Sequence, residues 1–128
     1  FYNVFGPGQI MHGKMSAVIG TFEKQYKKRK PLTIVKPGTQ KRDFTHIDDI
    51  VKGCYLAMIK GRQNEYMLCT NKSYSIIQIA KMFNTKIKFI KMRPGDRFKS
   101  TTINNNAKKI LGFKAIKDIR TYIRNLIK

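Results

Sequence analysis

The order of apolar and polar residues along the chain predicts strands and helices in alternation. Four of the first five residues are apolar or aromatic, which is typical of a buried strand, and a Gly-Pro-Gly sequence at 6–8 ends it. Further short strands are predicted over 32–35, 65–69 and 86–90, with a short extended piece over 39–44. The clean alternation within 86–90 indicates that one face of that strand is exposed.

Apolar residues recur at helical spacing in the segments between these strands. A Thr-x-x-Asp sequence at 45–48 and a Ser-x-x-Gln capping box at 75–78 each mark the start of a helix. The predicted helices cover 14–28, the segment from 45–48 to Gly61, the residues that follow Ser75, 105–111 up to Gly112, and 116–127. The side chains expected to face the core are Met15, Val18, Ile19, Phe22 and Tyr26, then Ile50, Val51, Cys54 and Met58, then Ile76, Ile79, Ala80 and Phe83. The alternation predicts an α/β fold.

Length and cysteine content limit the possible classes of protein. A chain of 128 residues is long enough for one hydrophobic core, and it has no apolar run of the roughly 20 residues that a membrane span needs. Cys54 and Cys69 have no partners at zinc-ligand spacing, and two cysteines are too few for a disulfide scaffold. We expect both thiols to be buried or half-buried in a reducing, cytoplasmic protein, and we expect no metal site.

The charge balance is strongly basic, with 27 Lys and Arg against 7 Asp and Glu and a formal net charge of +20. Such a protein attracts polyanions, so a nucleic-acid-binding module is the first alternative function to consider. The basic residues are scattered, however, and form only one dense run at 27–30. This distribution favours non-specific electrostatic attraction to nucleic acid over a dedicated binding groove.

Several segments, taken in order, resemble the extended short-chain dehydrogenases/reductases. That family includes the NAD-dependent nucleotide-sugar epimerases and dehydratases, among them UDP-glucose 4-epimerase-like enzymes. The matching segments together cover nearly the whole chain. They are FYNVFGPGQ at 1–9, PLTIV at 31–35, GTQKRDFTHIDD at 38–49, the strand and capping box within 66–79, RPGD at 93–96, and AKKILGF at 107–113.

The resemblance implies that residues 1–128 form the C-terminal substrate-binding portion of such an enzyme. Residues 1–9 resemble a strand of the Rossmann sheet that is otherwise missing, since the chain opens without Met on a strand with no predicted partner. No Gly-x-Gly-x-x-Gly turn for a dinucleotide is present, because Gly6, Gly8 and Gly13 have the wrong spacing. Tyr26 and Lys30 have the spacing of the family's catalytic Tyr-x-x-x-Lys, but any tyrosine before this basic run has it, so we reject the match.

The catalytic residues and most NAD contacts are therefore expected upstream of Phe1. The resemblance implies NAD as the cofactor of the parent enzyme and a homodimer as its assembly. We expect the 128-residue piece alone to be inactive and to hold no cofactor. A non-catalytic relative that acts as a partner or scaffold is a further alternative.

Six residues take substrate-binding roles by this resemblance, and the physical chemistry of a nucleotide sugar fits them. Guanidinium groups present planar pairs of donors to phosphate oxygens, and a carboxylate accepts from ribose hydroxyls. The assignments are Arg42 and Arg93 with Asn3 at the diphosphate, Asp96 at the ribose, and the backbone of Thr33 to Val35 along the base. Family members often carry Gly-Asp-Gly where this chain has Lys-Pro-Gly at 36–38, which leaves details of base and sugar recognition open.

Each of these residue patterns also has a purely structural interpretation. Arg42 and Asp43 are adjacent and could form a local ion pair, and the sequence at 93–96 is an ordinary turn sequence. Asp48 and Asp49 lie at a helix start, where the helix dipole favours negative charge, so we interpret them as capping residues. His46 has no nearby nucleophile or metal partner and is interpreted as a packed or capping residue.

Overall fold

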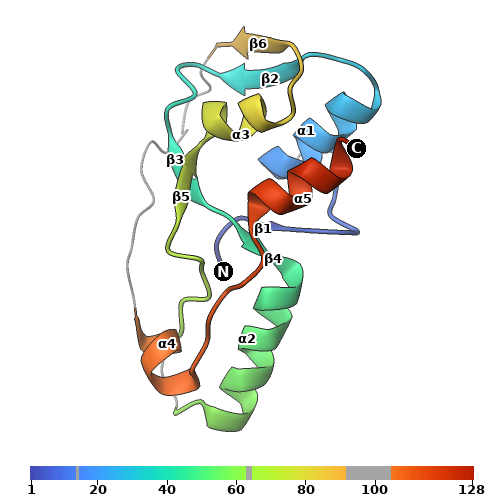
Figure 1. The fold of residues 1–128 in the computed structure, drawn as a ribbon. Helices are drawn as coiled ribbons and strands as arrows, with labels where there is room; N and C mark the ends of the chain where they lie inside the picture. Colours follow the sequence, from blue (N-terminus) through green and yellow to red (C-terminus); the bar gives the residue numbers. More distant parts are fainter. Residues whose placement is uncertain (14, 63–64, 92–104) are drawn as a thin grey trace.

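A computed structural model describes residues 1–13, 15–62, 65–91 and 105–128, and it contains the predicted mixture of helices and strands (Figure 1). The strands are β1 (Val4–Phe5), β2 (Leu32–Val35), β3 (Lys41–Asp43), β4 (Thr45–His46), β5 (Ser73–Ser75) and β6 (Ile87–Ile90). The helices are α1 (Val18–Lys27), α2 (Ile47–Lys60), α3 (Ile76–Met82), α4 (Asn106–Leu111) and α5 (Ile119–Leu126).

Within the described residues, the strands pair in three separate two-stranded sheets. β1 pairs with β4 in parallel, with Val4 opposite Thr45, and β2 pairs with β6 in parallel over four residues. β3 and β5 form an antiparallel pair in which Arg42 lies opposite Tyr74. The first strand therefore does have a partner, which the sequence analysis missed. β4 is only two residues long, and its sequence indicated the start of a helix.

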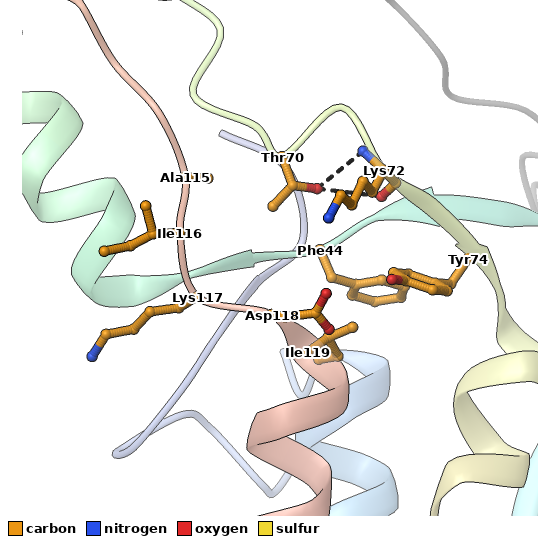
Figure 2. Close-up of a pocket in the computed structure, with 9 residues that line it drawn as sticks. All are labelled: Phe44, Thr70, Lys72, Tyr74, Ala115, Ile116, Lys117, Asp118 and Ile119. Atoms are coloured by element: carbon orange, nitrogen blue, oxygen red, sulfur yellow. Dashed lines mark hydrogen bonds between the residues drawn. The ribbon is translucent and has the colours of Figure 1, made fainter.

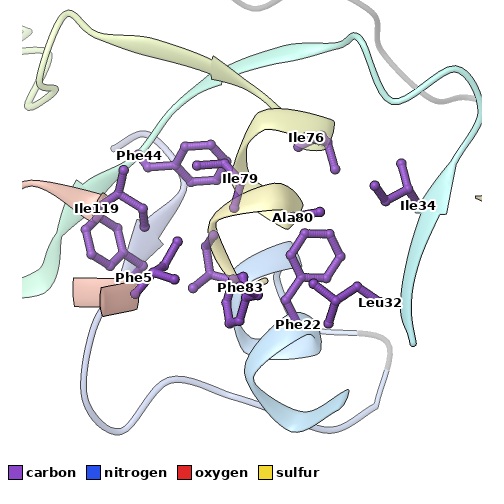
Figure 3. Packing of buried hydrophobic residues seen from close by; sticks show 12 residues of the cluster. Phe5, Phe22, Leu32, Ile34, Phe44, Ile76, Ile79, Ala80, Phe83 and Ile119 are labelled. Atoms are coloured by element: carbon purple, nitrogen blue, oxygen red, sulfur yellow. The ribbon is translucent and has the colours of Figure 1, made fainter. Parts of the chain in front are cut away.

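The main core lies where α1, α3 and α5 meet β2 and the β1–β4 pair (Figure 3). Phe22 of α1 and Phe83 after α3 meet edge to face, with ring centroids 5.9 Å apart. The four inward residues predicted for the helix after Ser75 are all buried, and the capping box between Ser75 and Gln78 is present. The cluster consists of Phe5, Ile19, Phe22, Leu32, Ile34, Phe44, Ile76, Ile79, Ala80, Phe83, Ile119 and Ile123.

A second, smaller cluster holds α2 against α4 and the segment around Leu68. Gly53 makes this approach possible, because a Cβ atom there would lie 2.6 Å from Cδ1 of Leu68. The last helix is anchored to α2 through Asp49, a buried residue that accepts the backbone N–H groups of Ile116 (3.1 Å) and Lys117 (2.9 Å). Asp49 therefore connects α2 to the segment that precedes α5, in addition to the interaction with the dipole of its own helix that the sequence predicted.

Several predicted boundaries were wrong. The first helix starts at Val18, and Met15 before it is exposed rather than part of the buried stripe. Residues 65–69 form no strand, although one was predicted there. The final helix begins only after Asp118, whose side chain accepts the N–H of Arg120. By contrast, the end of the 105–111 helix is as predicted, with Gly112 in the left-handed conformation (φ 68°).

The buried face predicted for α2 was also wrong. Ile50 is buried, but Val51, Cys54 and Met58 are exposed, so the expectation for Cys54 fails while that for Cys69, a buried thiol, is confirmed. The side chain that caps α2 is His46 rather than Thr45. The buried face was mispredicted because α2 carries apolar residues on opposite sides. Their spacing therefore predicts a helix but does not indicate which side packs inward.

Candidate functional site

Asn3 lies just before β1 and reaches across to β3. Its side-chain Nδ2 donates a 2.8 Å hydrogen bond to the carbonyl oxygen of Asp43. Its backbone adopts a positive φ of 34°, a conformation that asparagine tolerates better than most residues. Asn3 therefore contacts β3 at the residue that follows Arg42, another of the residues predicted at a diphosphate.

Asp43 is the fixed centre of this region. Its buried carboxylate accepts the hydroxyl (2.8 Å) and the N–H (3.1 Å) of Thr70 and the hydroxyl of Thr45 (3.3 Å). These donors come from segments before and after α2 and hold β3 in place. The sequence indicated Asp43 only as an ion-pair partner for Arg42. Thr70 is far from Asp43 in the sequence, and Thr45, although near, forms no recognisable motif with it.

Arg42 is half-buried in β3, where its Nη1 donates a 2.9 Å hydrogen bond to the carbonyl of Lys41. Two further residues assigned to the nucleotide, Arg93 and Asp96, lie outside the described residues, as does the rest of the predicted loop at 93–96.

The outer edge of β2 presents the backbone groups predicted to contact the base. The N–H groups of Leu32 and Lys36 bond to Lys86 (2.8 Å) and Ile90 (3.0 Å) on the β6 side. Because backbone direction alternates along a strand, the N–H and C=O groups of Thr33 and Val35 point to the opposite edge. No other strand pairs with that edge within the residues that the structure describes.

Gln25 of α1 occupies part of this edge. Its Oε1 accepts the Thr33 N–H (3.0 Å), and its Nε2 donates to Oγ1 of Thr33 (2.8 Å). Gln25 also lines a polar cavity of about 330 Å³ between α1 and the preceding loop. The cavity is lined by Met11, Gly13, Ser16, Thr21, Lys24, Gln25, Lys28 and Lys30. Sequence analysis missed Gln25, since a glutamine within a helix carries no signal for a strand eight residues away.

A second cavity, of about 280 Å³, opens beside β1 and the turn that follows it. It is lined by Val4, Phe5, Gly6, Pro7, Gly8, Gln9, Ile10, Met15, Ala17 and Ile47. Gln9 crosses from this cavity to the core, where its Nε2 donates to the Glu23 carboxylate (2.7 Å). The other amide atom of Gln9, Oε1, is buried without a hydrogen-bond partner.

The pocket shown in Figure 2 is much smaller, about 40 Å³. Phe44, Tyr74 and Asp118 surround it together with Thr70, whose hydroxyl bonds to the backbone of Lys72. A space of this size holds about one water molecule. None of the six residues predicted to bind substrate lines it, so it is not a candidate substrate site.

Buried ionisable groups lie near the second cavity. Burial alone raises the pKa of Glu23, but hydrogen bonds from Lys27, Gln9 and Tyr122 and the Lys27 charge outweigh it, so the net pKa lies below its usual value. Burial, with the charge of Glu23 and the hydrogen bond to it, raises the pKa of Tyr122 to about 12. The buried ring of His46 packs edge-on against Phe5, and burial lowers its pKa. Glu23 and Tyr122 are hydrogen-bonded structural partners. His46 packs against Phe5 and caps α2, which confirms the packed or capping role predicted for it.

No cluster of three potential metal ligands occurs within residues 1–13, 15–62, 65–91 and 105–128. Over the same ranges, no helix has both the length and the apolar character that crossing a membrane requires.

Comparison with known proteins identifies the family. Residues 1–70, more than half of the chain, match the NAD dependent epimerase/dehydratase family, and the chain belongs to that family. Its fold is that of part of an extended short-chain dehydrogenase/reductase.

Individual relatives agree with this assignment. Over 119 residues the chain is 24% identical to UDP-glucuronic acid decarboxylase 6 of Arabidopsis thaliana, a match that covers 88% of this chain and 34% of the relative. It superimposes on UDP-glucose 4-epimerase of Thermotoga maritima, solved with UDP-glucose, with a TM-score of 0.90 and 24% identity over 98% of this chain and 42% of that one. UDP-glucuronic acid 4-epimerase of Bacillus cereus, solved with UDP-glucuronic acid and NAD, gives a TM-score of 0.73 and 24% identity over 98% and 44%. The chain thus spans about a third or less of the curated relatives it matches.

Proposed function

We propose that this chain forms the substrate-binding portion of an NAD-dependent nucleotide-sugar epimerase or dehydratase, with a UDP-sugar as the favoured substrate. The observation that carries the proposal is the hydrogen bond between Asn3 and the Asp43 carbonyl. It holds Asn3, in the first segment of the chain, against β3, the strand that carries Arg42. The family resemblance assigns both Asn3 and Arg42 to a diphosphate.

The chemistry of a nucleotide sugar fits the remaining features. A diphosphate is bound best by guanidinium donors, here Arg42 together with Arg93. The outer edge of β2 offers the Thr33 carbonyl as an acceptor and the Val35 N–H as a donor. A uracil imide presents a donor beside an acceptor, so it can pair with such an edge as a neighbouring strand does. Asp96 is the proposed acceptor for the ribose hydroxyls.

This portion contributes binding and orientation rather than bond chemistry. NAD, when bound to the parent enzyme, takes a hydride from the sugar and returns it. Asn3, Arg42 and Arg93 hold the diphosphate so that the sugar is fixed in one position, and such positioning lowers a reaction barrier by several kcal/mol. We propose that the catalytic tyrosine, the lysine and most NAD contacts lie in the part of the family fold that this chain does not span. We also expect the parent to be a cytoplasmic homodimer.

Calorimetric titration of the purified chain with UDP, in about 0.15 M salt, tests the proposal, with inorganic pyrophosphate as the control ligand. We expect UDP to bind more tightly than pyrophosphate, because pyrophosphate lacks the base and ribose contacts. Arg42→Ala and Arg93→Ala should each weaken UDP binding. Lys88→Ala removes one positive charge from an exposed position of β6 and should leave it unchanged. Equal affinity for the two ligands, or equal effects of all three substitutions, would contradict the proposal.

A further inference from the structure

The one dense run of basic residues in the sequence does not form a single exposed surface in the fold. Lys27 turns back along α1 and forms an ion pair with Glu23, whose carboxylate lies 2.7 Å from its Nζ. Lys28 and Lys30 instead line the cavity of about 330 Å³ between α1 and the loop before it, together with Lys24. Residues four apart share one face of a helix, so Lys24 and Lys28 are neighbours on the same wall. The fold therefore gathers three lysines around one space.

The loop side of this cavity is held against α1 by specific contacts. Gly20 lets the loop approach the helix closely, because a Cβ atom there would lie 2.4 Å from the carbonyl oxygen of Ile10. Closer to the opening, the hydroxyls of Ser16 in the loop and Thr21 in α1 form a 3.0 Å hydrogen bond with each other. Both hydroxyls line the cavity. The space is therefore a formed feature with polar walls on both sides.

The positive charge of the cavity is not compensated in the part of the chain that the structure describes. There, no carboxylate lines the cavity, and the ion pairs involve other lysines. The carboxylates of Asp43, Asp48 and Asp49 are engaged elsewhere in the fold. Like charges four residues apart on a helix repel each other, and an ammonium group has donors but no acceptor. A ligand that fits this space must therefore bring negative charge and several acceptor atoms.

We propose that this cavity binds a phosphorylated small molecule that carries hydroxyl groups, about the size of a monosaccharide phosphate. The three lysines and the two hydroxyls receive its phosphate oxygens and its own hydroxyls. The volume lies at the lower end of the range for small-molecule pockets, and inorganic phosphate alone would leave much of it empty. Met11 supplies the one apolar side chain among the described lining residues, so a mainly apolar ligand does not fit.

This site is separate from the nucleotide site proposed above. None of the four described residues assigned to the nucleotide sugar lines the cavity, and the amide of Gln25, which does line it, is already bonded to Thr33. A nucleic-acid strand is a poorer occupant, because it needs an extended basic groove with aromatic side chains, whereas these lysines surround one compact space. The inference does not rest on the proposed UDP site, so a failure to bind UDP leaves it standing.

Phosphorus NMR of the purified protein tests the proposal, with glucose 6-phosphate as the probe in about 0.15 M salt. We expect the phosphorus signal of the probe to shift as protein is added, and to shift in the same way when UDP is present in excess. The double variant Lys24→Ala with Lys28→Ala should weaken this binding by about tenfold or more, since two charged donors are lost. Lys60→Ala with Lys81→Ala is the matched control. It removes two exposed lysines that also lie in the last turns of helices.

A further variant separates the shape of the cavity from its charge. Gly20→Ala keeps every lysine but pushes the loop away from α1, so it should also weaken binding of glucose 6-phosphate. Binding that is lost in the cavity variants and kept in the control supports the proposal. Three results overturn it: no shift of the probe with the unaltered protein, equal weakening in the two double variants, or displacement of the probe by UDP. The last result would assign the lysines to the nucleotide site instead.

Discussion

The phenol of Tyr122 in α5 donates a 3.1 Å hydrogen bond to the carboxylate of Glu23 in α1. The carboxylate is buried and also accepts Gln9 (2.7 Å) and Lys27 (2.7 Å). This contact joins the first and last helices of the chain beside the cavity that follows β1. It gives the two helices a fixed relationship that apolar packing alone does not specify.

Removal of the Tyr122 hydroxyl should destabilise the fold. In Tyr122→Phe, Glu23 loses one of three donors while staying buried, which should lower the free energy of unfolding by about 1–2 kcal/mol. Urea denaturation followed by circular dichroism measures the change. Tyr55→Phe removes the same hydroxyl from an exposed position in α2 and is the matched control. Equal free energies of unfolding for the two variants would show that the hydrogen bond to Glu23 makes no net contribution to stability.

His46 should make stability depend on pH. Its Nδ1 accepts the Asp48 N–H (3.2 Å), and burial lowers its pKa below the usual 6.5. As the pH falls below 6.5, the unfolded chain therefore binds a proton that the folded chain does not, and the free energy of unfolding falls until the pH passes the lower folded pKa. His46→Asn keeps a capping acceptor and should flatten this dependence, whereas His12→Asn, at an exposed residue, should not. Urea denaturation between pH 5 and 8 covers the range in which histidine changes charge.

Gln25 should position the strand edge proposed for the base. In Gln25→Ala, Thr33 loses both of its bonds from α1, so we expect weaker UDP binding and unchanged pyrophosphate binding, because the diphosphate contacts lie elsewhere. Lys24→Ala provides a comparison at the neighbouring residue that lines the same cavity, where the substitution removes a positive charge instead of the bonds to Thr33. Calorimetric titration of both variants gives the comparison. An equal loss of affinity for UDP and pyrophosphate would assign Gln25 a merely structural role.

Arg93 should affect substrate binding in the complete enzyme more than turnover. Loss of one charge-assisted contact to the diphosphate costs roughly 1.5–3 kcal/mol. Arg93→Ala should therefore raise KM strongly and lower kcat less. Steady-state kinetics with the nucleotide sugar of that enzyme provides the measurement. An unchanged KM would remove Arg93 from the substrate site.

Binding to nucleic acid should be weak and electrostatic. With a net charge of +20 but scattered lysines, the chain should bind a short single-stranded RNA at low salt and lose this affinity near physiological salt. Fluorescence anisotropy of a labelled oligonucleotide across a salt series measures the slope. Tight binding at about 0.15 M salt would favour the alternative nucleic-acid-binding function.

Local signals in the sequence were sufficient for much of the secondary structure. The capping box at Ser75 and Gln78 and the left-handed Gly112 depend on residues a few positions apart, and both are present as predicted. The strand at Leu32–Val35 is also present as predicted, with Leu32 and Ile34 buried. The clean alternation predicted within 86–90 was wrong, because Lys88 and Phe89 of β6 are both exposed. For the site, the ordered motifs assign Asn3 and Arg42 to one function, which stays a prediction; the structure shows Asn3 bonded to the carbonyl of Asp43, the residue next to Arg42.

The sequence by itself thus determined the helices, their order and the family, but it predicted a strand at 65–69 that is absent and gave no indication of β4 or β5. The tertiary structure decided which partners those elements have: β4 for the first strand, Thr70 for Asp43 and Thr33 for Gln25. It also decided which side of α2 is inside. Periodicity describes the spacing of apolar residues along one element. In a helix that is apolar on both sides, each of the two faces carries apolar residues at helical spacing, so the pattern fits either face as the buried one. Only the neighbours that the whole fold supplies can choose between the two faces, because burial depends on contacts between residues far apart in the chain.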